Sequence, residues 1–570
     1  MEKWVLTAKR ADFAGIGHKF GIDQVTARLI RNRDVIQEED IRKYLYGNLE
    51  DLPSPWLLKD MEKAVGILEG KIREGAKIRI IGDYDIDGVT STFILLKGLT
   101  RVGAKVDTYI PDRVADGYGI REHLIHKAAQ DGIDTIVTCD NGIAAAKEIE
   151  SAKEKGMTVV ITDHHEIPYR DTEKGREYIL PPADAVINPR QPDCPYPNKK
   201  LCGAVVAFKM ISALYDRMGI PEKELEDYLE LAAIATVGDV MDLQGENRIL
   251  VKEGLKRLPH TKNKGLWALI EANGLEGGRI SAYHVGFVLG PCINASGRLD
   301  TASRSLALLK TESMDEAAKL AGDLTALNES RKALTEKGKN EAIELVETTA
   351  LKEDRVLVIF LPDCHESLAG IIAGRIREKY NKPAFVLTRG ETCVKGSGRS
   401  IEGYSMYEEL VKCADLMVQF GGHPMAAGLS LEEKNVDVLR RRLNENCTLT
   451  EEDLRPKVVI DVPMPVSYIT KKLIGEIGLL EPFGKGNTKP LFAQKNLRVL
   501  ECRVLGKNRN VAKFRLMDES GAGIDGVYFG EAEEFASYVR GKERISVTYY
   551  PEINRYMGRE SIQAVVQNYC

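Results

Sequence analysis

Three carboxylates stand at alternate positions just after an apolar, β-branched run that ends at Gly82. Asp83, Asp85 and Asp87 follow this run, and Gly88 then opens a predicted helix. In open α/β sheets, ligands collect at the carboxyl ends of parallel strands, and clustered acids repel one another unless a cation lies among them. Taken alone, this stretch fits an acidic turn with a helix cap as well as it fits a metal site.

A calcium-binding loop is excluded for the same stretch. The spacing D-x-D-x-D-G matches the first six positions of such a loop, but the twelfth position holds Ile94 where a bidentate glutamate is needed. A predicted strand, not a helix, also leads into it.

Three further polar clusters follow predicted elements, and together with the first they indicate one shared site. A lone Asp-Asn-Gly is usually a turn, and a lone His pair is usually a surface feature or a satisfied core group. Four clusters at element ends instead predict a set of metal ligands: Asp83, Asp85, Asp87, Asp140, His164 and Asp239.

The chemistry of these ligands favours a particular kind of ion. Carboxylates with imidazole and no thiolate favour Mn²⁺ or Mg²⁺ over a structural zinc. Several bridging carboxylates suit two ions about 3.5–4 Å apart, which activate water against a phosphoryl group. Asp163 or His165 is the candidate for proton transfer.

The four clusters also carry a family resemblance. DYDIDG, CDNG, DHH and GDV resemble the motifs of the DHH phosphoesterase superfamily, and GGHPMAAG (421–428) resembles the signature of the DHHA1 domain. Segments 110–119, 187–204 and 293–299 are similar to the RecJ family of single-stranded-DNA-specific exonucleases. The resemblance implies 5′→3′ digestion, and it implies that Arg113, Tyr118 and Arg298 bind the substrate.

A second α/β unit begins with VLVIFL (356–361) and continues in PAFVLT (383–388). Its Gly-rich segments, GSGRS (396–400) and FGGHPMAAG (420–428), are interpreted as turns whose backbone N–H groups hold phosphate oxygens. The predicted substrate-binding residues here are Ser397, Arg399, Gly422 and His423. A tight packing turn with an incidental histidine is the alternative.

The elements that must position these residues follow a strand, turn, helix rhythm. Strands are predicted at 106–110, 135–138 and 158–162 with helices between them, which is typical of βαβ units and a parallel sheet. The Pro- and Asn-rich segment 181–201 is predicted to be irregular. Segment 302–349 is predicted to be helical, as one long helix that bridges two domains or as two packed helices.

The last part of the chain changes to short alternating strands, predicted at 497–505, 512–516, 545–550 and 561–566. Five or so such strands suggest a small barrel, and the family carries an OB-like domain here. Basic residues between Lys495 and Arg515 could follow a phosphate backbone, and Tyr549, Tyr550 and Tyr556 could stack bases. A solvated charged face is the alternative.

At 570 residues the chain is too long for one core. The predicted fold class is two α/β domains, a DHH parallel-sheet domain and a DHHA1 domain, joined by a long helical linker and followed by a C-terminal OB-like β-barrel. The predicted boundaries are a helical lead-in at 1–50, the DHH domain at 51–300, the linker at 301–350, the DHHA1 domain at 351–450 and the OB-like domain at 455–570.

Composition constrains the partners and the compartment. A net charge of −5 means that nucleic acid must be bound through local basic patches. The start of the chain lacks an apolar signal core and no run is long enough for a membrane span, so we expect a cytoplasmic protein without membrane contact. Ten cysteines without a C-x-x-C pair suit reduced thiols.

Three functions compete. The leading hypothesis is a metal-dependent exonuclease that hydrolyses single-stranded DNA in repair and recombination, with a single-strand-binding protein and a helicase as further partners. The second is a DHH phosphodiesterase for short oligonucleotides or cyclic dinucleotides. The third is a non-catalytic replication or repair scaffold, whose mark would be lost metal ligands; none of the six is lost.

Overall fold

Five parallel strands form the first sheet of the computed structural model, which describes residues 2–113, 116, 119–173, 175–556 and 558–570. Their order is β3-β2-β4-β5-β8. The strands are β2 (Lys77–Ile81), β3 (Lys105–Tyr109), β4 (Thr135–Cys139), β5 (Thr158–Thr162) and β8 (Ala185–Ile187). The predicted strands and the parallel sheet are confirmed. The prediction of an irregular segment at 181–201 is wrong for β8, because its three apolar residues pair with β5 although Pro and Asn surround them.

Helices cover both faces of this sheet, so its strands are buried on both sides. One face packs against α4 (Met61–Arg73), α5 (Ile86–Arg101) and α8 (Gly203–Met218). The other packs against α6 (Glu122–Gln130) and α7 (Ala146–Glu154). Burial on both faces explains why β4 and β5 read as apolar runs rather than as alternating patterns.

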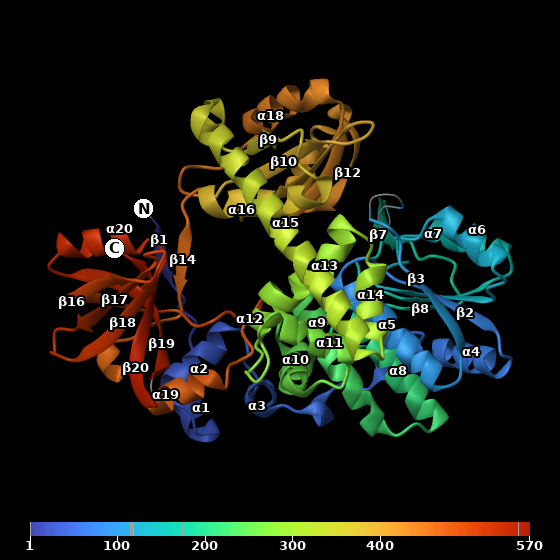
Figure 1. The fold of residues 1–570 in the computed structure, drawn as a ribbon, viewed down its shortest axis with the longest axis horizontal. Helices are drawn as coiled ribbons and strands as arrows, with labels where there is room; N and C mark the ends of the chain where they lie inside the picture. Colours follow the sequence, from blue (N-terminus) through green and yellow to red (C-terminus); the bar gives the residue numbers. More distant parts are fainter. Residues whose placement is uncertain (1, 114–115, 117–118, 174, 557) are drawn as a thin grey trace.

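A helical layer continues the same body. It contains α9 (Leu229–Gly238), α10 (Gly245–Arg257), α11 (Lys264–Ala272), α12 (Ala282–His284), the π-helical η5 (Val285–Leu289), α13 (Gly290–Leu299) and α14 (Ser303–Lys310). The 35-residue helix α15 (Met314–Thr348) follows and runs from this body into the upper lobe in Figure 1. Segment 302–349 therefore combines both alternatives, because a short helix precedes one long bridging helix.

The upper lobe holds a second sheet with the order β12-β13-β11-β10-β9. Its strands are β9 (Leu357–Phe360), β10 (Ala384–Arg389), β11 (Val394–Arg399), β12 (Met417–His423) and β13 (Ala426–Leu431), and its helices are α16 (Ala369–Tyr380), α17 (Met406–Val411) and α18 (Val436–Glu445). The interpretation of the Gly-rich segments as turns is wrong for most of their length, because they form strands β11, β12 and β13; Pro424 and Met425 form the turn between β12 and β13. Glycine is needed there for packing: a Cβ on Gly396 would lie 2.2 Å from Leu387 Cδ2, and one on Gly398 would lie 2.4 Å from Met406 Sδ.

A closed barrel forms the third lobe, at the left of Figure 1. Its strand order is β15-β16-β17-β18-β20-β19, and pairing between β16 and β19 closes it. The strands are β15 (Val462–Pro463), β16 (Phe492–Leu505), β17 (Val511–Met517), β18 (Gly523–Phe529), β19 (Ile545–Tyr556) and β20 (Arg559–Tyr569), with α20 (Ala532–Arg540) beside them. The predicted fold class, two α/β domains with a long helix between them and a C-terminal barrel, is confirmed.

The structure of the barrel contradicts the prediction that Tyr549 and Tyr550 stack bases. Tyr549 is fully buried and donates a hydrogen bond to the Met464 carbonyl at 2.7 Å, and Tyr550 is also buried. Neither ring can stack a base; Tyr556 is exposed. Part of the basic face is neutralised as well, because Arg498, Arg509 and Arg515 lie in ion pairs with Glu543, Glu533 and Asp525.

The start of the chain packs against its end. Strand β1 (Lys3–Leu6) pairs with β14 (Lys457–Ile460), and helices α1 (Phe13–Phe20), α2 (Gln24–Asn32) and α3 (Glu38–Tyr46) share a hydrophobic core with the barrel and with α19 (Lys471–Gly478). The buried Arg248 on α10 donates to the Tyr44, Leu479 and Leu480 carbonyls. These contacts fix the barrel against the first body.

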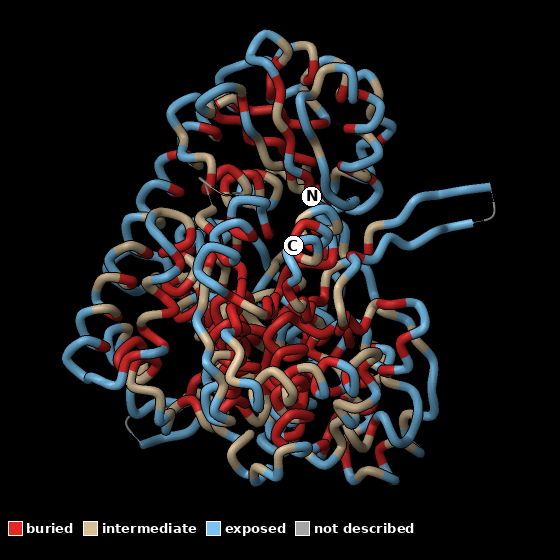
Figure 2. Tube along the Cα trace, turned by 90° about the vertical axis from the view of Figure 1, so that its right-hand side faces the viewer, coloured by how far each residue is buried: buried red, intermediate tan, exposed pale blue. Residues whose placement is uncertain are grey.

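Two segments complete the description. The hairpin β6 (Tyr169–Thr172) and β7 (Gly175–Tyr178) follows the cluster after β5 and projects from the molecule as an exposed ribbon in Figure 2. Within the described residues, no helix combines the length and the apolar character needed to cross a bilayer.

Candidate metal centre

Carboxylates lie at the carboxyl ends of β2, β4 and β5, where neighbouring parallel strands end side by side. After β2, Asp85 is the N-cap of α5, and its Oδ1 accepts from the N–H groups of Asp87 at 2.9 Å and Gly88 at 3.0 Å. The acidic-turn interpretation and the metal-site interpretation are therefore both partly true: Asp85 caps a helix, and Asp83 and Asp87 are buried beside it.

His164 lies close to Asp140 and to two other carboxylates of the cluster. His164 Nε2 lies 2.9 Å from Asp140 Oδ1, 3.5 Å from Asp87 Oδ2 and 3.9 Å from Asp239 Oδ2. Asp239 follows the last residue of α9, which packs against α5. The six residues predicted as ligands therefore form one cluster, although they come from four separate parts of the chain.

Three groups of side chains in this cluster have ligand atoms within 4.8 Å of one another. They are Asp83 with Asp85 and Asp140, Asp87 with His164 and Asp239, and Asp140 with His164 and His165. Asp140 belongs to two of these groups. Groups that share a side chain in this way could hold two divalent cations.

The N-terminus of α8 holds Asp87, and the sequence interpretation missed it. Asp87 Oδ2 accepts from Gly203 N–H at 2.6 Å, and Oδ1 accepts from Ala204 N–H at 2.8 Å. A Cβ on Gly203 would lie 2.7 Å from Asp140 Cβ, so this position needs glycine. The only signal in the sequence is the Cys-Gly-Ala triplet at 202–204.

Asp163 and His165 form a hydrogen-bonded pair beside the cluster. Asp163 Oδ1 lies 2.8 Å from His165 Nδ1 and accepts from the N–H groups of His164 and His165, while Oδ2 accepts from Ile143 N–H. Because this buried carboxylate is already fully engaged, its geometry favours positioning of His165 over direct proton transfer. Burial alone would lower the pKa of His165, but the hydrogen bond and charge of Asp163 raise it to about 9.

Burial and mutual repulsion raise the pKa of the clustered acids. The pKa of Asp83 and of Asp239 rises to about 8 and that of Asp87 to about 6, first because of burial and then because of neighbouring carboxylates. Burial lowers the pKa of His164 to about 3, so its imidazole is neutral and available as a ligand. Asp83 Oδ1 is buried and accepts no hydrogen bond from the described residues. An unsatisfied buried oxygen among like charges fits a divalent cation.

These shifts predict an unusual pH dependence for the metal-free protein. Carboxyl groups that ionise near 3.8 when unfolded keep their protons to about pH 6–8 when folded. Between pH 3.8 and about pH 8 the folded state therefore binds more protons than the unfolded state, so the free energy of unfolding falls as pH rises between these values. With EDTA, we expect Tm to drop by about 5 °C or more between pH 5 and pH 8.

Calorimetry with Mn²⁺ and with Asp239→Asn checks this prediction. Mn²⁺ should raise Tm more at pH 8 than at pH 5, and the variant should flatten the metal-free curve. A metal-free Tm that stays constant or rises between pH 5 and pH 8 would contradict the electrostatic description of the cluster.

Cationic side chains lie next to the cluster on the side of α13. Arg298 on α13 donates to the Ser367 carbonyl at 2.8 Å, which connects the first body to the upper lobe. Burial, with the charges of Arg113 and Arg331, lowers the pKa of Arg298 to about 10. The Arg113 guanidinium lies over the Tyr84 ring, 4.8 Å from its centroid. Tyr118, predicted to bind substrate, lies outside the described residues.

The upper lobe contributes Ser397 and Arg399 from β11 and Gly422 and His423 from β12. Arg399 donates to the Gly398 carbonyl, and no carboxylate of the described chain lies within ion-pair distance of it. Burial and then the charge of Arg377 lower its pKa. Burial and the charges of Arg399 and Lys485 lower the pKa of His423, and the charge of Lys485 partly offsets the rise in the pKa of Asp239. The Lys485 carbonyl accepts from Leu243 N–H at 2.8 Å; the sequence interpretation missed this residue, which lies between α19 and β16.

The comparisons with known proteins agree with this geometry. Residues 77–236 match the DHH family, N-terminal domain, residues 353–448 match the DHHA1 domain, and residues 460–568 match the RecJ OB domain. The chain is 38% identical to the single-stranded-DNA-specific exonuclease RecJ of Bacillus subtilis, covering 96% of this chain and 68% of that protein. It is 34% identical to the Escherichia coli protein of the same name, with 95% of each chain covered.

A solved structure is also similar. RecJ from Thermus thermophilus in complex with Mn²⁺ is 30% identical in sequence, with a TM-score of 0.83 that covers 100% of this chain and 79% of that chain. The same protein has been solved in complex with Mg²⁺. The four clusters, the DHHA1 signature and the barrel thus have one explanation: the chain belongs to the RecJ family of single-stranded-DNA-specific exonucleases.

Proposed function

We propose that this chain is a metal-dependent exonuclease that hydrolyses phosphodiester bonds of single-stranded DNA, in the 5′→3′ direction, in repair and recombination. The observation that carries this proposal is the cluster of six carboxylate and imidazole side chains that follow β2, β4, β5 and α9. A scaffold without activity would not need this set of buried, mutually repelling acids.

Different residues of the site have different proposed roles. Asp83, Asp85, Asp87, Asp140, His164 and Asp239 would hold two divalent cations, Mn²⁺ or Mg²⁺. When bound, these cations supply Lewis acidity, which activates water as the nucleophile and offsets charge on the phosphoryl oxygens. Asp163 orients His165, whose imidazole is our candidate to donate a proton to the leaving oxygen.

The cationic residues bind and orient the strand. Arg298 lies near Asp85 of the cluster and Arg113 lies over the Tyr84 ring, while Arg399 and His423 come from the second sheet. A buried guanidinium without a carboxylate partner gains most from an external phosphate, because charge-assisted hydrogen bonds then replace its lost hydration. Ser397 and the backbone at Gly422 complete this side of the site.

A nuclease assay with Mn²⁺ tests the function. Labelled single-stranded DNA, duplex DNA and a linear dinucleotide are compared, and we expect mononucleotides from the single strand at the highest rate. Labels at the 5′ and 3′ ends establish the direction. If only the dinucleotide is hydrolysed, the chain is a short-oligonucleotide phosphodiesterase, and if nothing is hydrolysed it is a binding protein.

Arg399→Gln should weaken binding of single-stranded DNA by about 10- to 150-fold, because a charged hydrogen bond contributes about 1.5–3 kcal/mol. Mn²⁺ affinity should stay unchanged, since Arg399 is not a ligand. Arg389→Gln, at the end of β10 and paired with Glu433, is the control from the same sheet. Unchanged DNA affinity in both Arg399→Gln and His423→Ala would contradict a shared cleft.

The resemblance also predicts a single-strand-binding protein and a helicase as partners. A helicase supplies single strands, and a single-strand-binding protein covers them, so both would meet this enzyme on its substrate. Co-sedimentation of the purified proteins with and without DNA checks this prediction.

A further inference from the structure

Lys209, Glu246 and Tyr196 form a buried triad of polar side chains outside the metal centre. Lys209 Nζ lies 3.3 Å from Glu246 Oε2, and only 3% and 2% of these two side chains is exposed. The Tyr196 hydroxyl donates to Glu246 Oε2 at 2.7 Å, and Lys209 Nζ donates to the Pro53 carbonyl at 2.8 Å. The two charges are thus removed from water and hydrogen-bonded to two other parts of the chain.

Stability does not explain why this pair is buried. Two charges lose their hydration on burial, and their attraction restores that loss only when every polar atom is also hydrogen-bonded. Glu246 Oε1 is buried and accepts no hydrogen bond from the described residues. Apolar side chains of similar volume are often as stable as a buried ion pair or more so. We therefore looked for a role of the triad in the position of other residues.

Two members of the triad lie on either side of the point where the chain enters α8. Tyr196 belongs to the segment between β8 and α8, and Lys209 lies on α8 itself. The first N–H groups of this helix, those of Gly203 and Ala204, donate to the Asp87 carboxylate at 2.6 and 2.8 Å. The position of the start of α8 therefore determines the position of Asp87.

The third member connects the triad to Asp239. Glu246 lies in the first turn of α10, which segment 240–244 joins to Asp239. The next residue, Asn247, is also buried, and its Nδ2 donates to the Lys200 carbonyl at 2.7 Å and to the Asp242 carbonyl at 3.1 Å. One turn of α10 thus contacts both the segment that leads to α8 and the segment that follows Asp239.

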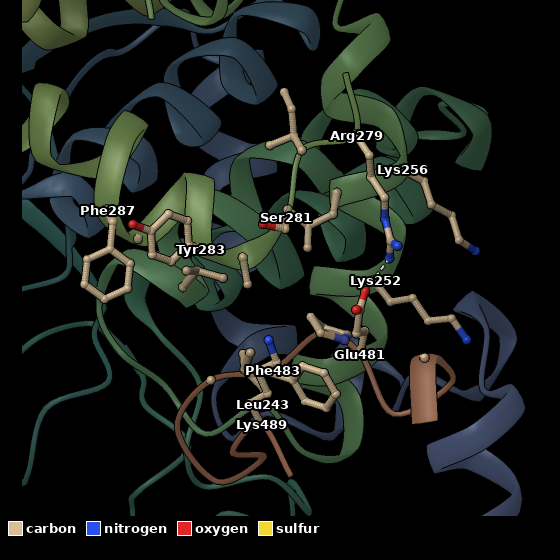
Figure 3. Close-up of a pocket in the computed structure, with 18 of the residues that line it drawn as sticks. Leu243, Lys252, Lys256, Arg279, Ser281, Tyr283, Phe287, Glu481, Phe483 and Lys489 are labelled. Atoms are coloured by element: carbon tan, nitrogen blue, oxygen red, sulfur yellow. Dashed lines mark hydrogen bonds and ion pairs between the residues drawn. The ribbon is translucent and has the colours of Figure 1, made fainter. Parts of the chain in front are cut away.

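The barrel lobe also contacts segment 240–244. Leu243 N–H donates to the Lys485 carbonyl at 2.8 Å, and Leu243 and Phe483 line the pocket drawn in Figure 3. Substitutions within this segment would change the contact between the lobes as well as Asp239. The buried triad touches neither Leu243 nor Asp239 directly, so its variants test position without changing that contact.

We propose that Lys209, Glu246 and Tyr196 are positioning residues that hold Asp87 and Asp239 at the spacing a divalent cation needs. These two carboxylates belong to one candidate ligand group with His164. Charged hydrogen bonds are directional, so they fix one arrangement of α8 and α10 where apolar contacts would permit several. The inference rests on the proposed function and assigns residues that keep its metal centre in place.

The variant Tyr196→Phe/Lys209→Met/Glu246→Leu tests this proposal in the full-length protein. It removes both charges and the hydroxyl at nearly constant volume, so no unpaired charge remains. We expect Tm in EDTA to equal or exceed that of the wild type. The Kd for Mn²⁺, measured by calorimetry, should rise about 10-fold, the lower end of the range for residues that orient metal ligands. On single-stranded DNA, kcat should fall by a similar factor while KM changes little.

Chemical rescue identifies the charge as the cause. Lys209 also lines a cavity of about 530 Å³ with Leu52, Phe208 and Leu225, so Lys209→Ala opens a space beside Glu246 that a small molecule can reach. Propylammonium replaces the atoms that alanine lacks and should restore the wild-type Kd for Mn²⁺. 1-Propanol, which has the same length and no charge, should not. Lys223→Ala, at the same cavity, is the control and should leave the Kd unchanged.

The Kd of the triple variant decides the outcome. A wild-type Kd for Mn²⁺ would overturn the proposal, whether or not Tm changes, and so would a triple variant that does not fold, because the triad would then serve the fold. Equal rescue by 1-propanol would overturn the role of the charge. None of these measurements needs hydrolysis. A wild-type protein that binds Mn²⁺ but does not cut DNA would count against the proposed exonuclease function instead.

Discussion

Asp140→Asn is expected to lower the hydrolysis rate by about three orders of magnitude or more, because loss of metal-based activation costs several kcal/mol of transition-state stabilisation. Asp140 belongs to two of the three candidate ligand groups, so its replacement removes a carboxylate oxygen from both of them. Asparagine is the appropriate replacement, since Asp140 has a φ of 60° and Asn tolerates this conformation better than Ala. Single-turnover rates with saturating Mn²⁺ measure the effect.

The same variant should not unfold the protein. Burial and four neighbouring carboxylates raise the pKa of Asp140 well above its usual range, so removal of its charge relieves repulsion when metal is absent. We expect an unchanged or higher Tm in EDTA. Glu166→Gln is the control, because Glu166 follows His165 directly but pairs with Arg190 at the surface. Retained hydrolysis in Asp140→Asn would exclude Asp140 as a ligand, and a sharp fall in metal-free Tm would indicate a structural role.

His165→Gln is expected to lower kcat by about 10²- to 10⁴-fold, the usual contribution of a proton donor or acceptor. Its Nδ1 is bound to Asp163 at 2.8 Å and lies 3.9 Å from Asp140 Oδ1, so the side chain is held beside the candidate metal ligands. Glutamine keeps a hydrogen-bonding group but cannot carry the proton. Mn²⁺ affinity, measured by calorimetry, should change by only a few fold.

Asp163→Asn separates positioning from catalysis. If Asp163 acts only through His165, its replacement lowers kcat, and the double variant Asp163→Asn/His165→Gln is no slower than His165→Gln alone. Additive losses would assign the two residues independent roles. A large loss of Mn²⁺ affinity in His165→Gln would make His165 a metal ligand with Asp140 and His164 rather than a proton donor.

The ligands of the metal centre could be predicted because their signals are local. Asp83, Asp85 and Asp87 follow an apolar run within a few residues, and Asp140 and His164 stand at the ends of similar runs. Parallel strands in α/β units end at one edge of the sheet, so residues at strand ends can be placed together without knowledge of the order of the strands. The sequence alone therefore predicted which residues form the cluster, the suitability of their side chains for hard cations and the succession of lobes.

Other features depend on contacts between distant parts of the chain. The sequence showed neither that Asp87 accepts from Gly203 and Ala204, more than a hundred residues away, nor that Asp163 is fully engaged by its hydrogen bonds. Glycines at 396 and 398 suggested a turn, and only the close approach of Leu387 and Met406 explains them within a strand.

Burial determines which aromatic side chains of the barrel are accessible to DNA. Tyr549 and Tyr556 lie on the same strand, yet barrel closure places the Tyr549 ring in the core and leaves Tyr556 exposed. Periodicity specifies which residues share a face of a strand or helix, but not which face another part of the chain covers. That choice belongs to the tertiary structure, because it depends on how β16 meets β19 and how the barrel packs against the first body.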